Sequence, residues 1–311
     1  MRRRTLTGAV LAGAIAPLLA LTACGGGGDP LAEETTDATG APGAVTVGSA
    51  NFPESELLAE MYAQVLEGEG VQVERSFNIG AREVYLRALQ DGSIDLLPEY
   101  NGALLAALSP DGVPEDVSSP EDVYDALQDV LPDGTETLEQ AAAEDKDTLT
   151  VTRETAEQYS LTSIADLAPV AGDLTAGGGP EFQERYQGLV GLEQVYGVTF
   201  GEYRPLDAGG PLTVQALSDG TIQVANLFST DSAIETNDFV PLEDPENLFL
   251  AQNIVPLIRS EVNDESITEA LNAFSATLTT ENLTEYLARV QVDRETPGAV
   301  ATAYLTDNGL A

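Results

Sequence analysis

One nine-residue segment occurs twice in this sequence, 128 residues apart, and this repeat constrains the fold more than any other feature. Residues 88–96 are Ala-Leu-Gln-Asp-Gly-Ser-Ile-Asp-Leu, and residues 216–224 are Ala-Leu-Ser-Asp-Gly-Thr-Ile-Gln-Val. Both copies are typical of a helix end, an Asp-Gly turn and a strand that enters a core. Because Asp-Gly is common at such junctions, chance similarity is one explanation. The other, which we favour, is a chain of two lobes built on one plan.

The elements before the first copy predict a parallel α/β sheet. Residues 45–49 are typical of a short buried strand, and apolar residues then recur at helical spacing. A second strand is expected at 71–77 and a second helix at 81–90, with Val84 and Tyr85 among the residues that face inward. This alternation of strands and helices implies a sheet of parallel strands.

The second half of the chain predicts how the lobes are divided. A strand at 148–152 begins a second lobe, and a late strand at 248–258 returns to the first. The helices expected in the last 45 residues or so would then complete the first lobe. We therefore expect residues 45–145 and 245–311 to form lobe 1, and residues 146–244 to form lobe 2.

Three loops, residues 49–52, 99–102 and 228–231, follow predicted strands. Ligands of open parallel sheets bind beyond the carboxyl ends of the strands, so these loops are expected to face one cleft. Tyr100 and Phe228 occupy equivalent places after the two copies of the repeat. The candidate ligand-binding residues are Ser49, Asn51, Phe52, Tyr100, Asn101, Phe228, Thr230 and Asp231, with Lys146, the single lysine, as a further candidate.

Each candidate also has a purely structural explanation. The polar residues can cap helices, and Asn51 in particular is expected to cap the first helix, with Pro53 in its first turn and Glu54 completing a capping box. The phenylalanines can pack in a core, and a lysine is most often solvated. Arg82 and Glu99 are expected to support the loops through an ion pair.

The N-terminal segment is typical of a lipoprotein signal peptide. A basic start at residues 2–4 precedes an apolar stretch of about a dozen residues, which is short of the roughly 20 that a membrane-spanning helix needs. Leu-Thr-Ala precedes Cys24, the only cysteine, and four glycines follow it. We expect residues 1–23 to be removed, Cys24 to carry lipid and residues 24–44 to form a flexible tether. The protein would then lie at the outer face of the cytoplasmic membrane.

Composition excludes several classes of function. The formal net charge is −39, or −42 without the three arginines of the signal peptide, so nucleic acid and bare anionic membrane are poor partners. Solubility outside the cell explains this acidity, and attraction of cationic solutes is the alternative. Histidine is absent, which excludes Ser-His-Asp and Cys-His catalysis and His-ligated metals. No cofactor is expected.

Two rival functions remain open. A carboxylate-based hydrolase would use two acidic residues near the cleft. Its candidates are Glu54, Glu56, Asp95, Glu99 and Asp231. A cell-surface protein that only binds another protein would present a flat apolar patch instead of a cleft.

Four segments carry a resemblance to a known family. They are Gly-Ser-Ala-Asn-Phe at 48–52, Asn-Ile-Gly-Ala-Arg-Glu-Val at 78–84, Pro-Glu-Tyr-Asn-Gly at 98–102 and Phe-Ser-Thr-Asp at 228–231. In this order and spacing the chain resembles the glycine betaine/choline (OpuAC-like) substrate-binding proteins of osmoprotectant ABC transporters. The resemblance implies a type II periplasmic-binding-protein fold, two α/β lobes joined by two crossover strands. It also implies a small solute, a permease and an ATPase as partners, and no catalysis.

The resemblance also predicts an altered pocket. Family members hold trimethylammonium in a box of tyrosines and the carboxylate with polar and cationic groups. Tyr100 matches the first box tyrosine, whereas the other box positions fall on residues that are not aromatic. Ala50 and Ala103 stand where the family pattern has lysine and threonine. We therefore predict weak binding of glycine betaine and a different solute, larger or less charged. The alternative is that Phe52, Phe228 or Tyr85 rebuilds the box and Lys146 meets the carboxylate.

Overall fold

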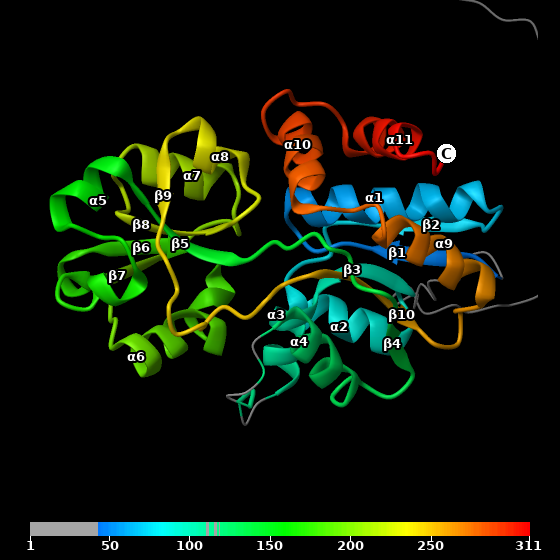
Figure 1. Ribbon diagram of the computed structural model, residues 1–311, viewed down its shortest axis with the longest axis horizontal. Helices are drawn as coiled ribbons and strands as arrows, with labels where there is room; N and C mark the ends of the chain where they lie inside the picture. The colour runs from blue at the N-terminus through cyan, green and yellow to red at the C-terminus, as the bar shows by residue number, and fades with distance from the viewer. Residues whose placement is uncertain (1–42, 110–111, 115–116, 118) are drawn as a thin grey trace, which may run out of the picture. The chain divides into compact units, whose positions relative to one another are not determined.

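The computed structural model describes residues 43–109, 112–114, 117 and 119–311, which contain two five-stranded mixed sheets with helices (Figure 1). The predicted signal peptide, Cys24 and most of the predicted tether lie outside the described residues. Within the described residues, no helix has both the length and the apolar character needed to cross a membrane.

The first lobe is the sheet with strand order β2-β1-β3-β10-β4 and its helices. Strand β1 pairs in parallel with β2 and β3, whereas β10 is antiparallel to β3 and β4. The strands are β1 (Val45–Gly48), β2 (Val73–Ser76), β3 (Leu96–Tyr100), β4 (Thr135–Thr137) and β10 (Ile254–Arg259). The helices are α1 (Pro53–Gly68), α2 (Arg82–Asp91), α3 (Asn101–Leu108), α4 (Pro120–Gln128), α9 (Glu265–Ser275), α10 (Thr280–Gln291) and α11 (Pro297–Asp307).

The second lobe repeats this plan with the order β7-β6-β8-β5-β9. Here β6 pairs in parallel with β7 and β8, and β5 is antiparallel to β8 and β9. The strands are β5 (Asp147–Thr152), β6 (Thr175–Gly178), β7 (Glu202–Pro205), β8 (Val224–Phe228) and β9 (Phe239–Pro241). The helices are α5 (Arg153–Tyr159), α6 (Gly191–Tyr196), α7 (Pro211–Ser218) and α8 (Ser232–Thr236). The boundaries predicted from the sequence, at residues 145/146 and 244/245, stay predictions.

The two copies of the repeat form the same local structure. Each leads from a helix, α2 or α7, through an Asp-Gly turn into a strand, β3 or β8. Gly92 and Gly220 have φ angles of 79° and 75°, which favour glycine. The preceding aspartate accepts a backbone hydrogen bond from the residue after the glycine in both turns, 2.9 Å in each. One set of turn residues therefore serves both lobes.

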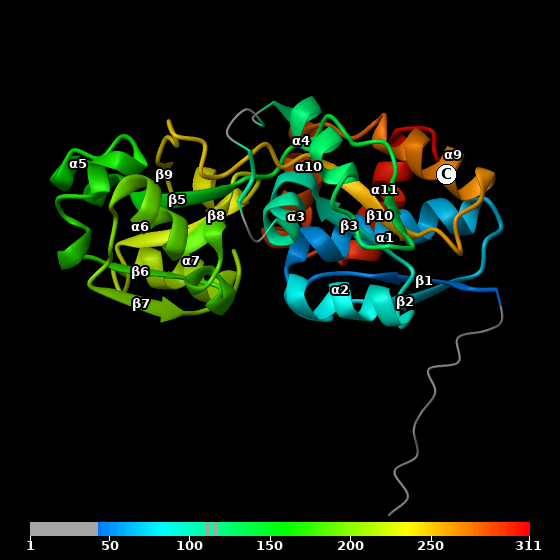
Figure 2. The same ribbon diagram turned by 90° about the horizontal axis from the view of Figure 1, so that it is seen from below.

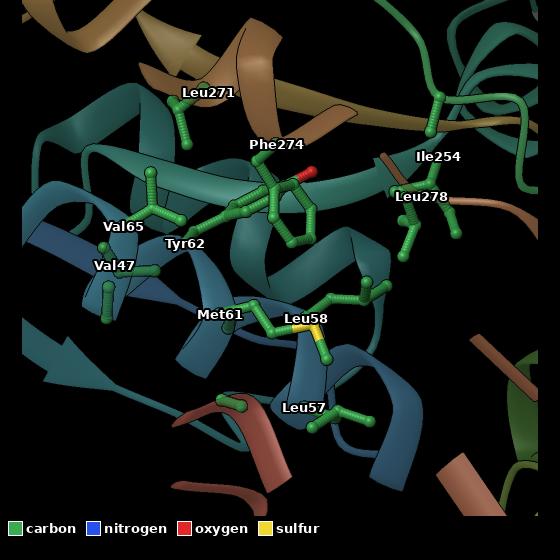
Figure 3. Packing of buried hydrophobic residues seen from close by; sticks show 14 of the residues in the cluster. Val47, Leu57, Leu58, Met61, Tyr62, Val65, Ile254, Leu271, Phe274 and Leu278 are labelled. Atoms are coloured by element: carbon green, nitrogen blue, oxygen red, sulfur yellow. The ribbon is translucent and has the colours of Figure 1, made fainter. Parts of the chain in front are cut away.

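The core of the first lobe lies on both faces of its sheet. On one face, Leu57, Met61 and Tyr62 of α1 are fully buried against the C-terminal helices, as Figure 3 shows. The Tyr62 and Phe274 rings meet edge to face, with centroids 5.4 Å apart. A separate cluster that includes Tyr85 covers the other face. The C-terminal helices thus share one core with α1 and the first sheet.

Three details of the sequence prediction are wrong. Helix α1 begins after Phe52 with no side-chain cap, so Asn51 is not the N-cap; instead Ser55 Oγ accepts a hydrogen bond from the Ala50 amide at 2.9 Å. Val84 is 41% exposed, because α2 packs on the sheet through Tyr85 and Leu89. The late strand begins only at Ile254, since the preceding residues cross between the lobes.

Two crossing segments join the lobes, one from β4 to β5 and one from β9 to β10 (Figure 2). They lie side by side where the Asp145 amide donates to Gln252 O at 3.1 Å and the Ala141 amide donates to Ile254 O at 2.8 Å. Gly102 lies against the second segment, and a Cβ on it would stand 2.2 Å from Ala251 O. Glycine at this position lets α3 approach the crossing backbone.

Candidate ligand-binding site

A cavity of about 850 Å³ lies between the two lobes. Its lining comes from the loops after β1 and β6, the ends of β3 and β8, the start of α2 and both crossing segments. Because the parallel strands of both sheets direct their carboxyl ends to this cavity, it is where their loops can meet a common ligand. The polar residues of the lining include Asn51, Arg82, Glu83, Asp145, Asp147, Glu181, Arg185, Asn226 and Gln252.

Three aromatic rings form part of the lining and contact one another. The Phe52 ring centroid lies 5.9 Å from that of Tyr100 and 5.0 Å from that of Phe228. Tyr100 ends β3 of the first lobe, and Phe228 ends β8 of the second. Phe52 therefore lies between the two aromatic residues that the repeat makes equivalent.

A buried ion pair fixes Arg82 in the first lobe. Its Nε and Nη2 atoms donate to the two oxygens of Glu99 at 2.8 and 3.0 Å, and its side chain is 10% exposed. Glu99 also accepts hydrogen bonds from the Tyr85 hydroxyl at 2.6 Å and the Tyr100 amide at 2.7 Å. Burial opposes the charge of Arg82, but the carboxylate of Glu99 raises the pKa of the guanidinium above its usual value. The cation is thus permanent and its orientation is set by four donors around one carboxylate.

The second lobe contributes a carboxylate held by amides. Asp147, the first residue of β5, accepts hydrogen bonds from Asn226 Nδ2 at 2.8 Å and from Gln252 Nε2 at 3.3 Å. Asn226 and Gln252 are buried, and all three residues line the cavity. Within the described part of the chain, Asp147 forms no ion pair with an arginine or lysine.

Buried carboxyl groups lie beside the cavity where the lobes touch. Thr230 Oγ1 of the second lobe donates to Glu54 Oε2 of α1 at 2.5 Å, and the Tyr100 hydroxyl donates to Glu54 Oε1 at 2.7 Å. Burial raises the pKa of Glu54 from 4.5 to about 7, against the hydrogen bonds from these two hydroxyls. Burial, with the negative charge of Glu54, raises the pKa of Asp145 well above its usual value. Near neutral pH this contact is therefore partly protonated.

A second contact spans the lobes at the cavity wall. Arg185 donates from Nε and Nη2 to the two oxygens of Glu83 at 3.1 and 3.0 Å. Both residues line the cavity, and both side chains are partly exposed. As a half-solvated pair it contributes about 1 kcal/mol or less. The pair holds both side chains in place at the cavity wall, and it occupies Arg185, the second arginine of the cavity.

Four of the predicted site residues line the cavity: Asn51, Phe52, Tyr100 and Phe228. Ala50 and Ala103, which were expected to enlarge the pocket, also line it.

The other predicted residues lie beside the cavity and hold its frame. Ser49 is buried and accepts a hydrogen bond from the Asn78 amide at 2.8 Å. Asn101 Oδ1 accepts from the Asn253 amide at 2.8 Å. Asp231 accepts from the Phe228 amide at 3.0 Å and from Gln291 Nε2 at 2.8 Å, and burial raises its pKa from 3.8 to about 6. Lys146 Nζ lies 3.9 Å from Glu144 and is partly exposed.

The five carboxylates considered for hydrolysis do not line the cavity that the described residues form. Asp95 pairs with Arg259 at 2.7 Å, and Glu99 pairs with Arg82. Nor do the described residues contain a group of three or more acidic, histidine or cysteine side chains that could hold a metal ion.

Sequence reasoning missed the polar part of the site. Arg82 was expected only to support loops, and it both does so and lines the cavity. Asp147 and Gln252 were missed, because Asp147 begins β5 directly after one crossing segment, Gln252 lies on the other, and their meeting depends on how the lobes pack. Asn226 gave a signal that could have been used: it is a lone amide within the otherwise apolar strand Val-Ala-Asn-Leu-Phe.

Comparison with known proteins identifies the family. Residues 43–307 match the OpuAC family, described as the substrate-binding domain of ABC-type glycine betaine transport systems. The chain belongs to this family. It is 28% identical over 279 residues to the glycine betaine-binding protein YehZ of Escherichia coli K12, which covers 85% of this chain and 90% of YehZ. It is 23% identical over 271 residues to the carnitine transport binding protein OpuCC of Listeria monocytogenes, 85% and 86% of the two chains.

Solved structures agree on the fold. The crystal structure titled glycine betaine/carnitine/choline ABC transporter superposes with a TM-score of 0.67 at 23% identity, covering 86% of this chain and 99% of that one. The type II periplasmic-binding-protein fold predicted from the sequence is confirmed. As an OpuAC member, the protein is a solute-binding component of an ABC importer that acts outside the cytoplasm with a permease and an ATPase, and it is not an enzyme.

Proposed function

We propose that this OpuAC protein is a lipid-anchored receptor that closes its two lobes over a small polar solute and delivers it to the permease. The observation that carries the proposal is the cavity of about 850 Å³, lined by the carboxyl ends of parallel strands from both lobes. Asn51, Phe52, Tyr100 and Phe228 are the proposed ligand contacts retained from the sequence analysis.

We propose that the solute is not glycine betaine, although relatives are named for glycine betaine and carnitine. Phe52 lies between Tyr100 and Phe228, so each of these rings has Phe52 as a neighbour on one side. Arg82 and Arg185 already form bidentate pairs with glutamates, and Lys146 is not part of the cavity lining. These features do not favour a compact trimethylammonium acid such as glycine betaine.

Closure would occur about a hinge in the crossing segments, with residues 45–145 and 245–311 moving against residues 146–244. A thermal-shift screen of quaternary amines, amino acids, thiones and sugars tests the receptor function. A solute present at 100 times its dissociation constant should stabilise the fold by about 2.7 kcal/mol. Small-angle scattering with that solute should then show a smaller radius of gyration. An unchanged melting temperature across all classes contradicts the receptor function, and an unchanged radius contradicts closure.

The anchor is a separate proposal that rests on residues 1–44 of the sequence. A lipid on Cys24 and a glycine-rich tether would keep the receptor near its permease. Cys24→Ser should release the protein from the membrane fraction or block its maturation. Mass spectrometry of the membrane-bound wild type should find a diacylated N-terminal cysteine, and an unmodified, uncleaved N-terminus contradicts the proposal.

A further inference from the structure

Arg82 lines the cavity, and one edge of its guanidinium is not engaged by Glu99. Glu99 engages Nε and Nη2, and within the described residues no partner is found for Nη1. Because the side chain is only 10% exposed and is held at two points, this edge has a fixed direction. A guanidinium with free N–H donors at a buried position is suited to an acceptor with negative charge, such as a carboxylate.

Asp147 supplies the opposite charge from the other lobe. Two amides orient it, and it lines the same cavity as Arg82. The two residues, both within the described chain, do not form a direct ion pair. The cavity is therefore lined by an oriented cation from the first lobe and an oriented anion from the second, and a ligand with both charges could contact both.

The surroundings of Asp147 determine what kind of cation fits. Asn226 and Gln252 donate hydrogen bonds to it, and Phe228 lies opposite it in the strand register. A quaternary ammonium carries no N–H, so it would leave carboxylate lone pairs desolvated without donors. A primary ammonium or guanidinium can donate hydrogen bonds to these lone pairs, so fewer polar groups are left unsatisfied.

We propose that the solute is a zwitterion whose cationic end carries N–H groups, with its carboxylate at Arg82 and its ammonium or guanidinium at Asp147. This inference rests on the proposed receptor function and specifies its substrate class: amino acids and guanidino acids instead of their permethylated analogues. The opposed charges would also draw the lobes together, since each end of the ligand is held by a different lobe.

Matched pairs that differ only in N-methylation test the inference by isothermal titration. The probes are 4-amino-3-hydroxybutanoate against carnitine, 4-aminobutanoate against its trimethyl analogue, and glycine against glycine betaine. At least one unmethylated member should bind about tenfold or more tighter than its trimethyl partner. Equal or tighter binding of the trimethyl members overturns the inference.

The variant Asp147→Asn removes the charge and retains an oxygen that can accept from Asn226. It should weaken binding of the unmethylated probe about tenfold or more, whereas the matched control Asp173→Asn, an exposed site on the same lobe, should leave it unchanged. Unchanged binding in Asp147→Asn overturns the inference. If amines of neither kind bind but sugars or thiones stabilise the protein, the inference fails and the receptor function stands. If no solute class has any effect, both fail.

Discussion

The two lobes share one strand order, yet the strand that follows the repeat is anchored differently in each. In the first lobe, Asp95 exchanges hydrogen bonds with the backbone of Thr46, at 2.9 Å through Oδ2 and 2.8 Å through its amide. In the second lobe, Gln223 makes the same exchange with Thr175, at 3.0 and 2.8 Å. Asp95 additionally pairs with Arg259, whereas Gln223 donates to Gly220 O at 2.9 Å. Both strands require a side-chain oxygen that accepts from the neighbouring strand. The negatively charged residue, Asp95, occurs only in the lobe where an arginine is within reach.

The same comparison shows that Arg82 and Asp147 have no charged counterpart at the equivalent place of the other lobe. By the offset of the repeat, Arg82 and Glu99 of the first lobe correspond to Gly210 and Leu227 of the second. By strand register, Asp147 is opposite Phe228 in the second lobe, and Ile254 is opposite Tyr100 in the first. The repeated plan thus fixes the backbone, while Arg82 belongs to the first lobe and Asp147 to the second. Such asymmetry is what a ligand with two different ends needs.

The largest expected effect comes from breaking the ion pair that only the first lobe has. Arg82→Met leaves Glu99 buried without its cation, so we expect the free energy of unfolding to fall by at least about 3 kcal/mol. Adding Glu99→Gln removes the buried charge that has no partner, and should recover much of the lost free energy of unfolding. Urea unfolding of both variants measures this. A single variant as stable as the wild type would show that the pair is not needed to support the loops.

A smaller effect concerns Glu54, which joins the lobes through Thr230. The folded protein binds the Glu54 proton more tightly than the unfolded chain does, because burial raises the pKa from 4.5 to about 7. Its stabilising contribution is therefore complete below pH 4.5 and is lost as the pH rises through 7. In Glu54→Gln this dependence is absent, so the stability of the variant relative to the wild type should rise by about 2 kcal/mol between pH 5 and pH 8. A difference that does not change with pH would contradict an interlobe carboxyl that is protonated below neutrality.

The smallest effect should be equal in the two lobes. Gly92→Ala and Gly220→Ala each place a Cβ on a residue with φ near +77°, and we expect each to cost about 1 kcal/mol. The added methyl group has room at both positions. A Cβ on Gly220 would have nothing within 4 Å, and one on Gly92 would meet only the end of the Arg259 side chain, at 3.1 Å. Thermal unfolding of both variants provides the comparison. A difference of more than about 1 kcal/mol would mean that the two turns do not play the same role.

Most of the fold could be predicted because its signals are local. The repeat carries its own turn residues, and the helices and strands follow from the spacing of apolar residues. Details failed where tertiary packing overrides local patterns. Asn51 has the sequence of a helix cap, but Ser55 takes the equivalent role by accepting from the Ala50 amide. The segment before Ile254 is apolar enough for a strand, yet it spans the gap between the lobes.

The candidate site could be predicted only in part, and for a physical reason. Tyr100 and Phe228 follow strands within the repeat, so their place at one edge could be inferred. Asp147 begins β5 and Gln252 lies on the second crossing segment, and nothing in their neighbourhood along the chain indicates that they meet at 3.3 Å. That meeting depends on how the lobes dock, which no local pattern encodes.

Isothermal titration of the wild-type protein with glycine betaine tests most directly whether the lobes hold their solute by opposed charges instead of an aromatic box. Each absent box ring removes up to about 2 kcal/mol, and a trimethylammonium group offers Asp147 no N–H donor, so we expect binding no tighter than about millimolar. Choline and carnitine, titrated alongside, should bind no better. A low-micromolar dissociation constant for glycine betaine would contradict the account, because it would require Phe52, Tyr100 and Phe228 to separate into a box that holds a trimethylammonium group.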